Sequence, residues 1–131
     1  MRKLITYLCF LSFAFLPLYA QDSNLTMAER SLENGNLKKL SAVFHKSVDI
    51  TFSNQAKTYS KAQAQIIIKK FFSKHEPKSF KIKQKGKSNA NSTLYAIGNL
   101  VSNNGTYRVY MFFVPSKGEY MLRELRFEKA D

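Results

Sequence analysis

The chain has little cysteine, little acidic charge, few histidines and no long hydrophobic run beyond its N-terminus. Its single cysteine, Cys9, lies in the N-terminal apolar segment, so disulfide bonds and thiolate metal sites are excluded for the rest of the chain. His45 and His75 are far apart, and we therefore expect no zinc site. Glycine-rich phosphate loops and the G-x-S-x-G nucleophile motif are also absent. We expect no metal, no cofactor and no recognisable catalytic motif.

The first twenty residues have the three parts of a secretory signal. Arg2 and Lys3 are followed by an apolar segment up to Leu18, and Ala20 is a small residue suited to cleavage. The apolar segment has about 15 residues, fewer than the ~20 that a membrane-spanning helix needs. We predict cleavage after Ala20, which leaves residues 21–131 as one periplasmic or secreted domain. The alternative is an uncleaved N-terminal anchor.

Positive charge dominates, with 21 Lys and Arg against 9 Asp and Glu. Lysines concentrate between Lys69 and Lys87, where Glu76 is the only acid. The export signal and the scarcity of arginine in this region argue against nucleic acid as a partner. An anionic envelope lipid or polysaccharide fits the charge better. The simpler interpretation is a solvated surface that keeps the protein soluble.

Two short helices and a strand are predicted at the start of the domain. Apolar residues recur at helical spacing over residues 25–32, before Gly35, and again over residues 37–44, where Asn36 is placed to cap the helix. Apolar and polar residues then alternate over residues 47–52, which is typical of a half-buried strand. A turn follows, leading into a hairpin or a strand and loop.

A longer helix comes next. Ser60-Lys61-Ala62-Gln63 fits a capping box at its start, and Pro77 closes it. The residues of its apolar stripe lie three or four positions apart: Ala64, Ile67, Ile68, Phe71 and Phe72. This helix must therefore pack on a sheet.

Four antiparallel strands are predicted after Pro77. In the first, residues 80–86 alternate with lysines that we expect to share one solvent-facing basic surface: Lys81, Lys83, Lys85 and Lys87. The other three cover Ser92 to Val101, Gly105 to Val114 and Glu119 to Glu128, with turn residues between them. The predicted fold class is α+β, with the helices gathered on one side of the sheet.

Several stretches carry a family resemblance: Gly35-Asn36-Leu37, Leu40-Ser41, Tyr59-Ser60-Lys61-Ala62-Gln63-Ala64, Phe71-Phe72, Lys78-Ser79-Phe80, Tyr95-Ala96-Ile97-Gly98 and Gly105-Thr106-Tyr107-Arg108-Val109-Tyr110. In order and spacing, the chain resembles the exported Bacteroidota family called domain of unknown function 4783, which in turn resembles the nuclear transport factor 2-like superfamily. The resemblance implies a cone, in which a curved antiparallel sheet wraps around the long helix, and a homodimer through the outer sheet face. The family has no assigned activity. The superfamily hosts both enzymes and non-catalytic domains.

Acid-base chemistry has two local candidates, His45 and Asp49. An isomerase or dehydratase site needs a histidine or carboxylate inside the apolar interior, where burial brings the pKa of a carboxylate toward neutrality. If Val48 and Ile50 line the core, the candidate pair faces outward, and about 13 Å of extended strand separates its members at ~3.3 Å per residue. His75 is better interpreted as a helix-end residue that favours the C-terminal dipole. We therefore predict that the protein is not an enzyme.

If the cone contains a pocket, its candidate ligand-binding residues lie on the last three strands: Tyr95, Tyr107, Arg108, Tyr110, Arg123 and Glu124. Because neighbouring residues alternate in a strand, only one of two pairs, Tyr107 with Val109 or Arg108 with Tyr110, can line the cone. The sequence leaves that choice open. The simpler interpretation is that the tyrosines are ordinary strand residues and that Arg108 pairs across strands with Glu124.

The leading functional prediction is an exported, non-enzymatic domain that binds a small apolar or amphipathic ligand, or a partner protein, in the cell envelope. One alternative is an isomerase- or dehydratase-like enzyme that uses a buried acid such as Asp49 or Glu124. The other is a dimeric interaction module whose lysine-rich strand meets anionic envelope surfaces.

Overall fold

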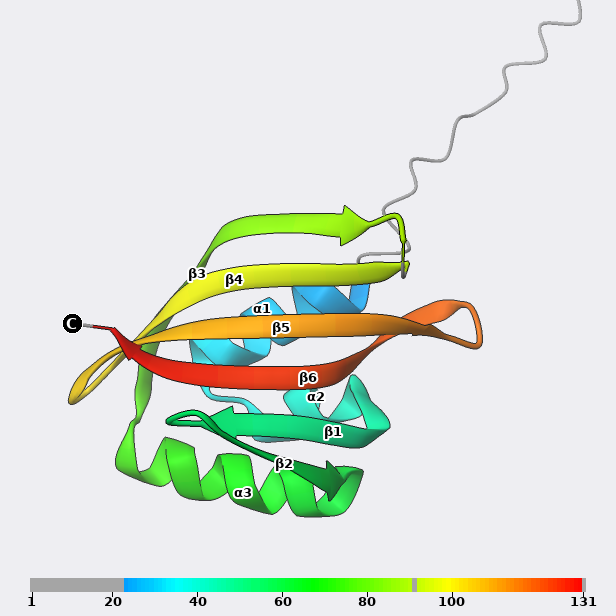
Figure 1. Ribbon diagram of the computed structural model, residues 1–131. Helices are drawn as coiled ribbons and strands as arrows, with labels where there is room; N and C mark the ends of the chain where they lie inside the picture. The colour runs from blue at the N-terminus through cyan, green and yellow to red at the C-terminus, as the bar shows by residue number, and fades with distance from the viewer. Residues whose placement is uncertain (1–22, 91, 131) are drawn as a thin grey trace, which may run out of the picture.

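The computed structural model describes residues 23–90 and 92–130 (Figure 1). The predicted signal segment, Cys9 included, lies outside these residues. The elements are α1 (Ser23–Asn34), α2 (Leu37–Ala42), β1 (Phe44–Phe52), β2 (Gln55–Ser60), α3 (Lys61–Lys74), β3 (Pro77–Ser88), β4 (Thr93–Ser102), β5 (Gly105–Ser116) and β6 (Glu119–Ala130). No helix within this part of the chain is long and apolar enough to cross a membrane.

The six strands form one sheet in the order β2-β1-β6-β5-β4-β3. All neighbours are antiparallel except β1 and β6, which run parallel. The sheet is therefore mixed, and the prediction of a fully antiparallel sheet is wrong at this pair. The chain passes through α3 and four strands between β1 and β6, so no hairpin turn imposes an antiparallel direction on them.

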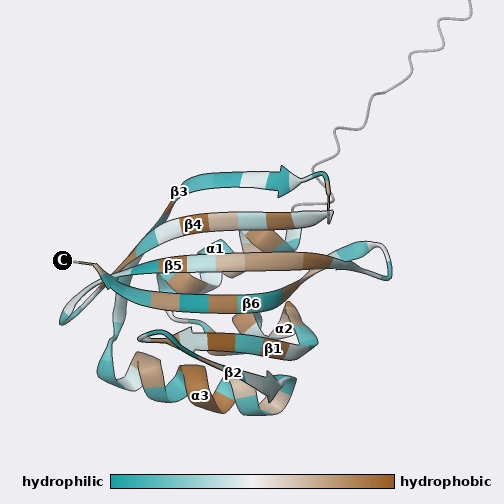
Figure 2. Cartoon of the chain, viewed as in Figure 1, coloured by the Kyte–Doolittle hydropathy of each residue, from teal (hydrophilic) through white to brown (hydrophobic). Residues whose placement is uncertain are grey.

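The helices gather on one side of the curved sheet, as predicted. Figure 1 shows α1 and α2 behind the sheet and α3 alongside the β1–β2 hairpin. Helix α1 contacts β3, β4 and β6, whereas α3 contacts β1, β2 and α2. One core fills the space between the layers, and its largest fully buried side chains include Phe44, Phe113 and Phe127. Hydrophobic residues accordingly concentrate in the middle strands, while β3 is largely hydrophilic (Figure 2).

The second helix is shorter than predicted. Its N-cap is confirmed, because the Asn36 side chain accepts a hydrogen bond from the Lys39 backbone N–H at 3.1 Å. The helix ends at Ala42, and Phe44 opens β1 instead of continuing the helix. The Leu122 N–H donates to the Val43 carbonyl at 2.7 Å, which draws this segment into the sheet. An apolar run that is buried in either conformation does not fix the boundary between them.

The capping box of α3 is confirmed. The Ser60 hydroxyl accepts from the Gln63 N–H, and the Gln63 side chain accepts from the Ser60 N–H, both at 3.2 Å. Only Ala64 and Ile68 of the apolar stripe are fully buried in the core. The other stripe residues, Ile67, Phe71 and Phe72, are only partly buried. One side of the stripe therefore faces an opening, not the packed core.

The lysines of β3 do not share one face of the sheet, contrary to the prediction. Lys81 lies opposite Asn99, but the register shifts between Ile82 and Gln84, and Lys85 then lies opposite Ala96. Directly paired residues share a face, so Lys81 lies on the outer side of the sheet and Lys85 on the helix side. All four predicted lysines are nevertheless exposed. A bulge, which strict alternation cannot foresee, splits the predicted basic surface.

Candidate functional site

The pairing and burial of residues in strand β5 show which of the two candidate pairs faces the interior. Tyr107 is opposite the buried Leu100 and packs against the core, and Val109 is fully buried. Arg108 and Tyr110 consequently lie on the outer face. Of the six candidate ligand-binding residues, the structure places only Tyr107 on the inner face of the cone.

Tyr95, Arg123 and Glu124 lie together around an outer hollow of about 400 Å³, beside Phe112. A bulge between Phe112 and Phe113 in the β5–β6 pairing places the consecutive residues Arg123 and Glu124 on the same face of the sheet. Two ion pairs lie on this face: Arg123 lies 3.2 Å from Asp49, and Arg126 lies 3.3 Å from Glu124.

The expected pairing of Arg108 with Glu124 is not observed. Glu128 lies opposite Arg108 in the β5–β6 register, and Glu124 pairs with Arg126 instead. The Arg126 guanidinium also lies over the Tyr110 ring, 5.7 Å from its centroid. Arg126 thus contacts both an acid and an aromatic ring on the outer face, although its buried Nε has no hydrogen-bond partner among the described residues.

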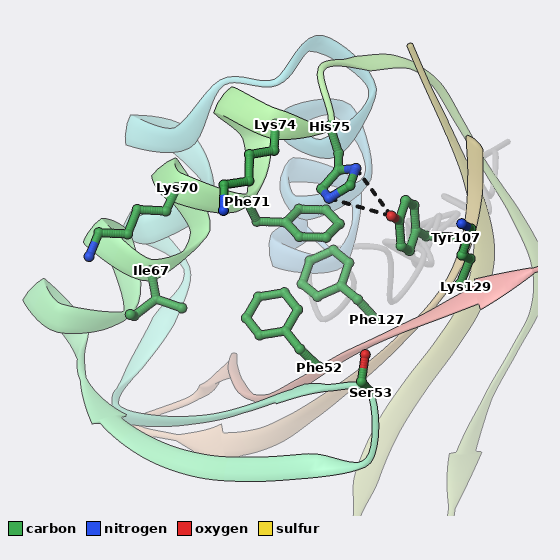
Figure 3. A pocket seen from close by; sticks show the side chains of 10 residues that line it. All are labelled: Phe52, Ser53, Ile67, Lys70, Phe71, Lys74, His75, Tyr107, Phe127 and Lys129. Carbon is green, nitrogen blue, oxygen red and sulfur yellow. Dashed lines mark hydrogen bonds between the residues drawn. The ribbon is translucent and has the colours of Figure 1, made fainter. Parts of the chain in front are cut away.

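A second opening, the α3 pocket, lies on the inner side at the end of α3. Its volume is about 390 Å³, and residues from α3, from the ends of β1 and β6 and from the start of β5 line it (Figure 3): Phe52, Ser53, Ile67, Lys70, Phe71, Lys74, His75, Tyr107, Phe127 and Lys129. Ile67 and Phe71 lie four positions apart on consecutive turns of α3, and His75, four positions further on, is the C-cap of the helix.

Aromatic rings form the floor of the α3 pocket. The Phe71 ring is central, with its centroid 4.5 Å from that of Phe127, 5.2 Å from that of Phe52 and 5.1 Å from that of Tyr107. Such separations are typical of favourable aromatic pairs. Phe52 and Phe71 are only half-buried, so part of this apolar surface is open to a ligand.

A hydrogen-bonded group closes one side of the pocket. The Asn104 amide nitrogen donates to the Lys74 carbonyl at 2.9 Å, which turns its oxygen toward His75 Nδ1 at 2.7 Å. His75 Nδ1 must therefore carry a hydrogen and donate it. The Tyr107 hydroxyl lies 3.1 Å from Nδ1 and 3.4 Å from Nε2 of the same ring (Figure 3). This network holds the imidazole and the phenol in fixed positions.

Lysines form the rim of the pocket. Lys70 and Lys74 come from α3 and Lys129 from β6, on the far side of the aromatic floor (Figure 3). None of the residues that line the pocket is acidic. Within residues 23–90 and 92–130, the ion pairs involve only Lys78, Arg123 and Arg126 as cations, so the three rim lysines have no carboxylate partner there.

Neither acid-base candidate on β1 reaches the α3 pocket. Val48 and Ile50 are buried, and Asp49 lies on the opposite face, as predicted, where it pairs with Arg123 and accepts a hydrogen bond from Thr58 at 2.5 Å. His45 is half-buried and does not line the pocket. Among the described residues, no group of three His, Asp or Glu side chains is arranged to hold a metal ion.

Sequence reasoning missed most of the pocket. It assigned Phe71 to the helix stripe and His75 to the helix end, and it did not single out Phe52 or Phe127 as site residues. Lys70 and Lys74 repeat the four-residue spacing of Phe71 and His75 one position earlier. A charged row beside an apolar row is the ordinary pattern of an amphipathic helix, so the helix sequence carried no local signal of an opening.

The architecture defines a class: a curved sheet wrapped around helices, with an opening at one end, as in nuclear transport factor 2-like proteins. A nuclear transport factor 2-like protein of unknown function from Burkholderia xenovorans matches with a TM-score of 0.61 at 10% identity, over 82% of this chain and 80% of that one. A Kribbella flavida structure provisionally assigned as a ketosteroid isomerase matches with a TM-score of 0.59 at 9% identity, over 86% of this chain and 78% of that one. These likenesses show the fold alone.

The family model described as "Domain of unknown function (DUF4783)" matches residues 25–128, and the chain belongs to that family. A family member from Bacteroides uniformis has a crystal structure that matches with a TM-score of 0.76 at 27% identity, over 81% of this chain and 96% of that one. No curated protein matches the chain. Family and fold are thereby shown, and neither assigns an activity to this chain.

Proposed function

We propose that the protein is an exported, non-enzymatic binding domain that holds a small apolar or amphipathic ligand in the α3 pocket. The observation that carries the proposal is the aromatic floor, where Phe52, Phe71 and Phe127 meet from three separate elements and leave apolar surface open. Ligand sites are typically concave, mostly apolar and fitted with a few fixed polar groups. The hydrogen-bonded His75 and Tyr107 side chains supply such groups.

The absence of acidic side chains from the pocket lining supports a binding role over an isomerase- or dehydratase-like one. Asp49 and Glu124, the acids that the enzyme alternative would use, are ion-paired on the outer face. An enzyme would have to draw its base from His75 or Tyr107, whose polar atoms already bond to each other. Fold likeness to a provisional isomerase does not favour the alternative, because one fold hosts many functions.

Export is part of the proposal and rests on the sequence pattern of residues 1–20. It has its own test, which is the N-terminal sequence of the protein recovered from its own cells. We expect the recovered chain to begin at Gln21. A chain that keeps Met1 would favour the anchored alternative.

The binding proposal is tested by native mass spectrometry of protein gently isolated from the cells that make it. The wild-type protein should retain an extra mass. Ile67→Trp should lose that mass, because an indole at position 67 would fill the pocket from α3. Ile66→Trp is the matched control: Ile66 is the neighbouring residue on the same helix, is 55% exposed and does not line the α3 pocket.

Retention of the mass by Ile66→Trp and its loss from Ile67→Trp would support the pocket, provided that both variants unfold at wild-type temperatures. An equal mass in all three proteins would place the ligand elsewhere and overturn the proposal. A dimer that carries no extra mass would favour the interaction-module alternative.

A further inference from the structure

We infer that the ligand of the α3 pocket is a small amphipathic anion, whose acidic head lies at Lys70, Lys74 and Lys129 and whose apolar body lies on the aromatic floor. The inference rests on the proposed function and adds the chemical class of the ligand. Its basis is the combination of an aromatic floor with a rim that carries charge of one sign only.

No acid among the described residues forms an ion pair with the lysines of the rim. Helix α3 contains no Asp or Glu in its sequence, KAQAQIIIKKFFSK. The nearest acid along the chain, Glu76, lies 3.6 Å from Lys78, and Glu128, the neighbour of Lys129, lies opposite Arg108 on the outer face. A concave surface lined by charges of one sign concentrates the electrostatic potential and attracts the opposite charge. An anion at the rim would also relieve the mutual repulsion of the lysines.

The arrangement of the pocket orients such a ligand. The cations lie on α3 and β6 at the edges, and the rings of Phe52, Phe71 and Phe127 lie between them (Figure 3). A head group at the rim stays partly hydrated, whereas the body replaces water on the rings. The volume of about 390 Å³ lies near the lower end of the range for ligand sites. It suits one ring system or a short acyl chain, and not the two chains of a membrane lipid.

The test uses two dyes with the same ring skeleton and measures their binding by fluorescence. 1-Anilinonaphthalene-8-sulfonate carries a negative charge, and N-phenyl-1-naphthylamine is its neutral counterpart. We expect the anionic dye to bind about tenfold more tightly at low salt, since three exposed cations each contribute roughly 0.2–1 kcal/mol, equivalent to a factor of about 1.4 to 5. Higher ionic strength should remove most of that preference.

Charge-removal variants locate the effect. Lys70→Gln, Lys74→Gln and Lys129→Gln combined should weaken binding of the anionic dye about tenfold and change binding of the neutral dye less than twofold. Lys81→Gln, Lys83→Gln and Lys85→Gln combined remove the same charge from β3, away from the pocket, and should leave both affinities unchanged. A sigmoidal thermal transition in each variant shows that the dyes are not reporting an unfolded state.

The outcomes separate the inference from the proposed function. Equal affinity for the two dyes, with both displaced by Ile67→Trp, would keep the pocket and overturn its anion preference. Dye binding that Ile67→Trp does not affect would overturn both.

A competition experiment with two ten-carbon ligands tests the same preference. Decanoate should compete with the anionic dye, and decanol should compete at least tenfold less well. Binding to phosphatidylglycerol vesicles that decanoate does not displace would assign the lysines to a lipid surface and overturn the inference.

Discussion

The inner and outer faces of β5 carry similar numbers of aromatic side chains, but they differ in whether the cations beside these side chains form ion pairs. On the outer face, Arg123 and Arg126 are paired with acids, and Arg126 also covers the Tyr110 ring. On the inner face, Tyr107 belongs to a pocket whose rim lysines have no acidic partner among the described residues. The difference teaches that charged residues near aromatic ones do not by themselves mark a ligand site. We propose the α3 pocket as a ligand site because its lysines, unpaired within the described part of the chain, lie beside open apolar surface.

The largest expected effect is a loss of stability, because side chains on the inner face are packed more fully than those on the outer face. Phe127 is 2% exposed and contacts both Phe52 and Phe71, so Phe127→Ala should destabilise the protein by about 3–5 kcal/mol. Phe112, half-buried on the outer face, should lose only about 1 kcal/mol in Phe112→Ala. Urea unfolding of both variants at one protein concentration checks the contrast.

An equally large loss in Phe112→Ala would break this comparison. It would mean that the outer face is covered in solution, as in the homodimer that the family resemblance implies. That homodimer stays a prediction, and the concentration dependence of the urea midpoint would reveal it, because only an oligomer gains stability with protein concentration.

Alanine substitutions at two glycines should lower stability by an intermediate amount, and they again compare the inner face of the sheet with the outer face. A Cβ at Gly98 would lie 2.5 Å from the Lys81 carbonyl oxygen and 2.7 Å from the Phe80 ring, so Gly98→Ala should cost about 1–3 kcal/mol. A Cβ at Gly86 would lie 2.8 Å from the Tyr95 hydroxyl. Tyr95 is half-buried on the outer face and can turn away, so Gly86→Ala should cost less than about 1 kcal/mol. Thermal unfolding of the two variants measures the difference, and a larger loss at Gly86 would show that the outer face is the more rigid one.

The smallest effect is expected at the ion pair of the outer face. The side chains of Asp49 and Arg123 are each 35% exposed and lie 3.2 Å apart, so Asp49→Asn should cost only about 0.2–1 kcal/mol. The cost should shrink in 1 M salt, where charges are screened. Glu119→Gln, which removes an exposed acid that has no ion pair among the described residues, is the control. If Asp49→Asn lowered the free energy of unfolding by more than about 2 kcal/mol, and salt did not change that loss, the pair could not be an ordinary exposed ion pair.

Local signals predicted most elements of the fold. The capping residues Asn36 and Ser60 act within four residues of chain, and both caps are observed. The three final strands and their turns also follow from local alternation and turn chemistry. The boundary at Phe44 could not be predicted, because its pairing partner, Leu122, is remote in the sequence.

The candidate site was predicted only in part, because it depends on how strands and helices meet. Tyr107 was among the candidates, but the inner face of β5 was identified only by its pairing with buried residues of β4. The residues after Tyr107 on the same face, Val109, Met111 and Phe113, are uncharged and all buried, whereas the alternate set contains Arg108. That asymmetry was a usable signal for the inner face.

By itself, the sequence determined the order of helices and strands, the caps, the turns and the family, because each depends on neighbours along the chain. Only the tertiary structure decided the parallel β1–β6 pair, the bulge that splits the β3 lysines and the meeting of Phe52, Phe71 and Phe127. A strand has two faces, and a one-residue register shift exchanges them. The pocket therefore depends on long-range pairing, which no local pattern encodes.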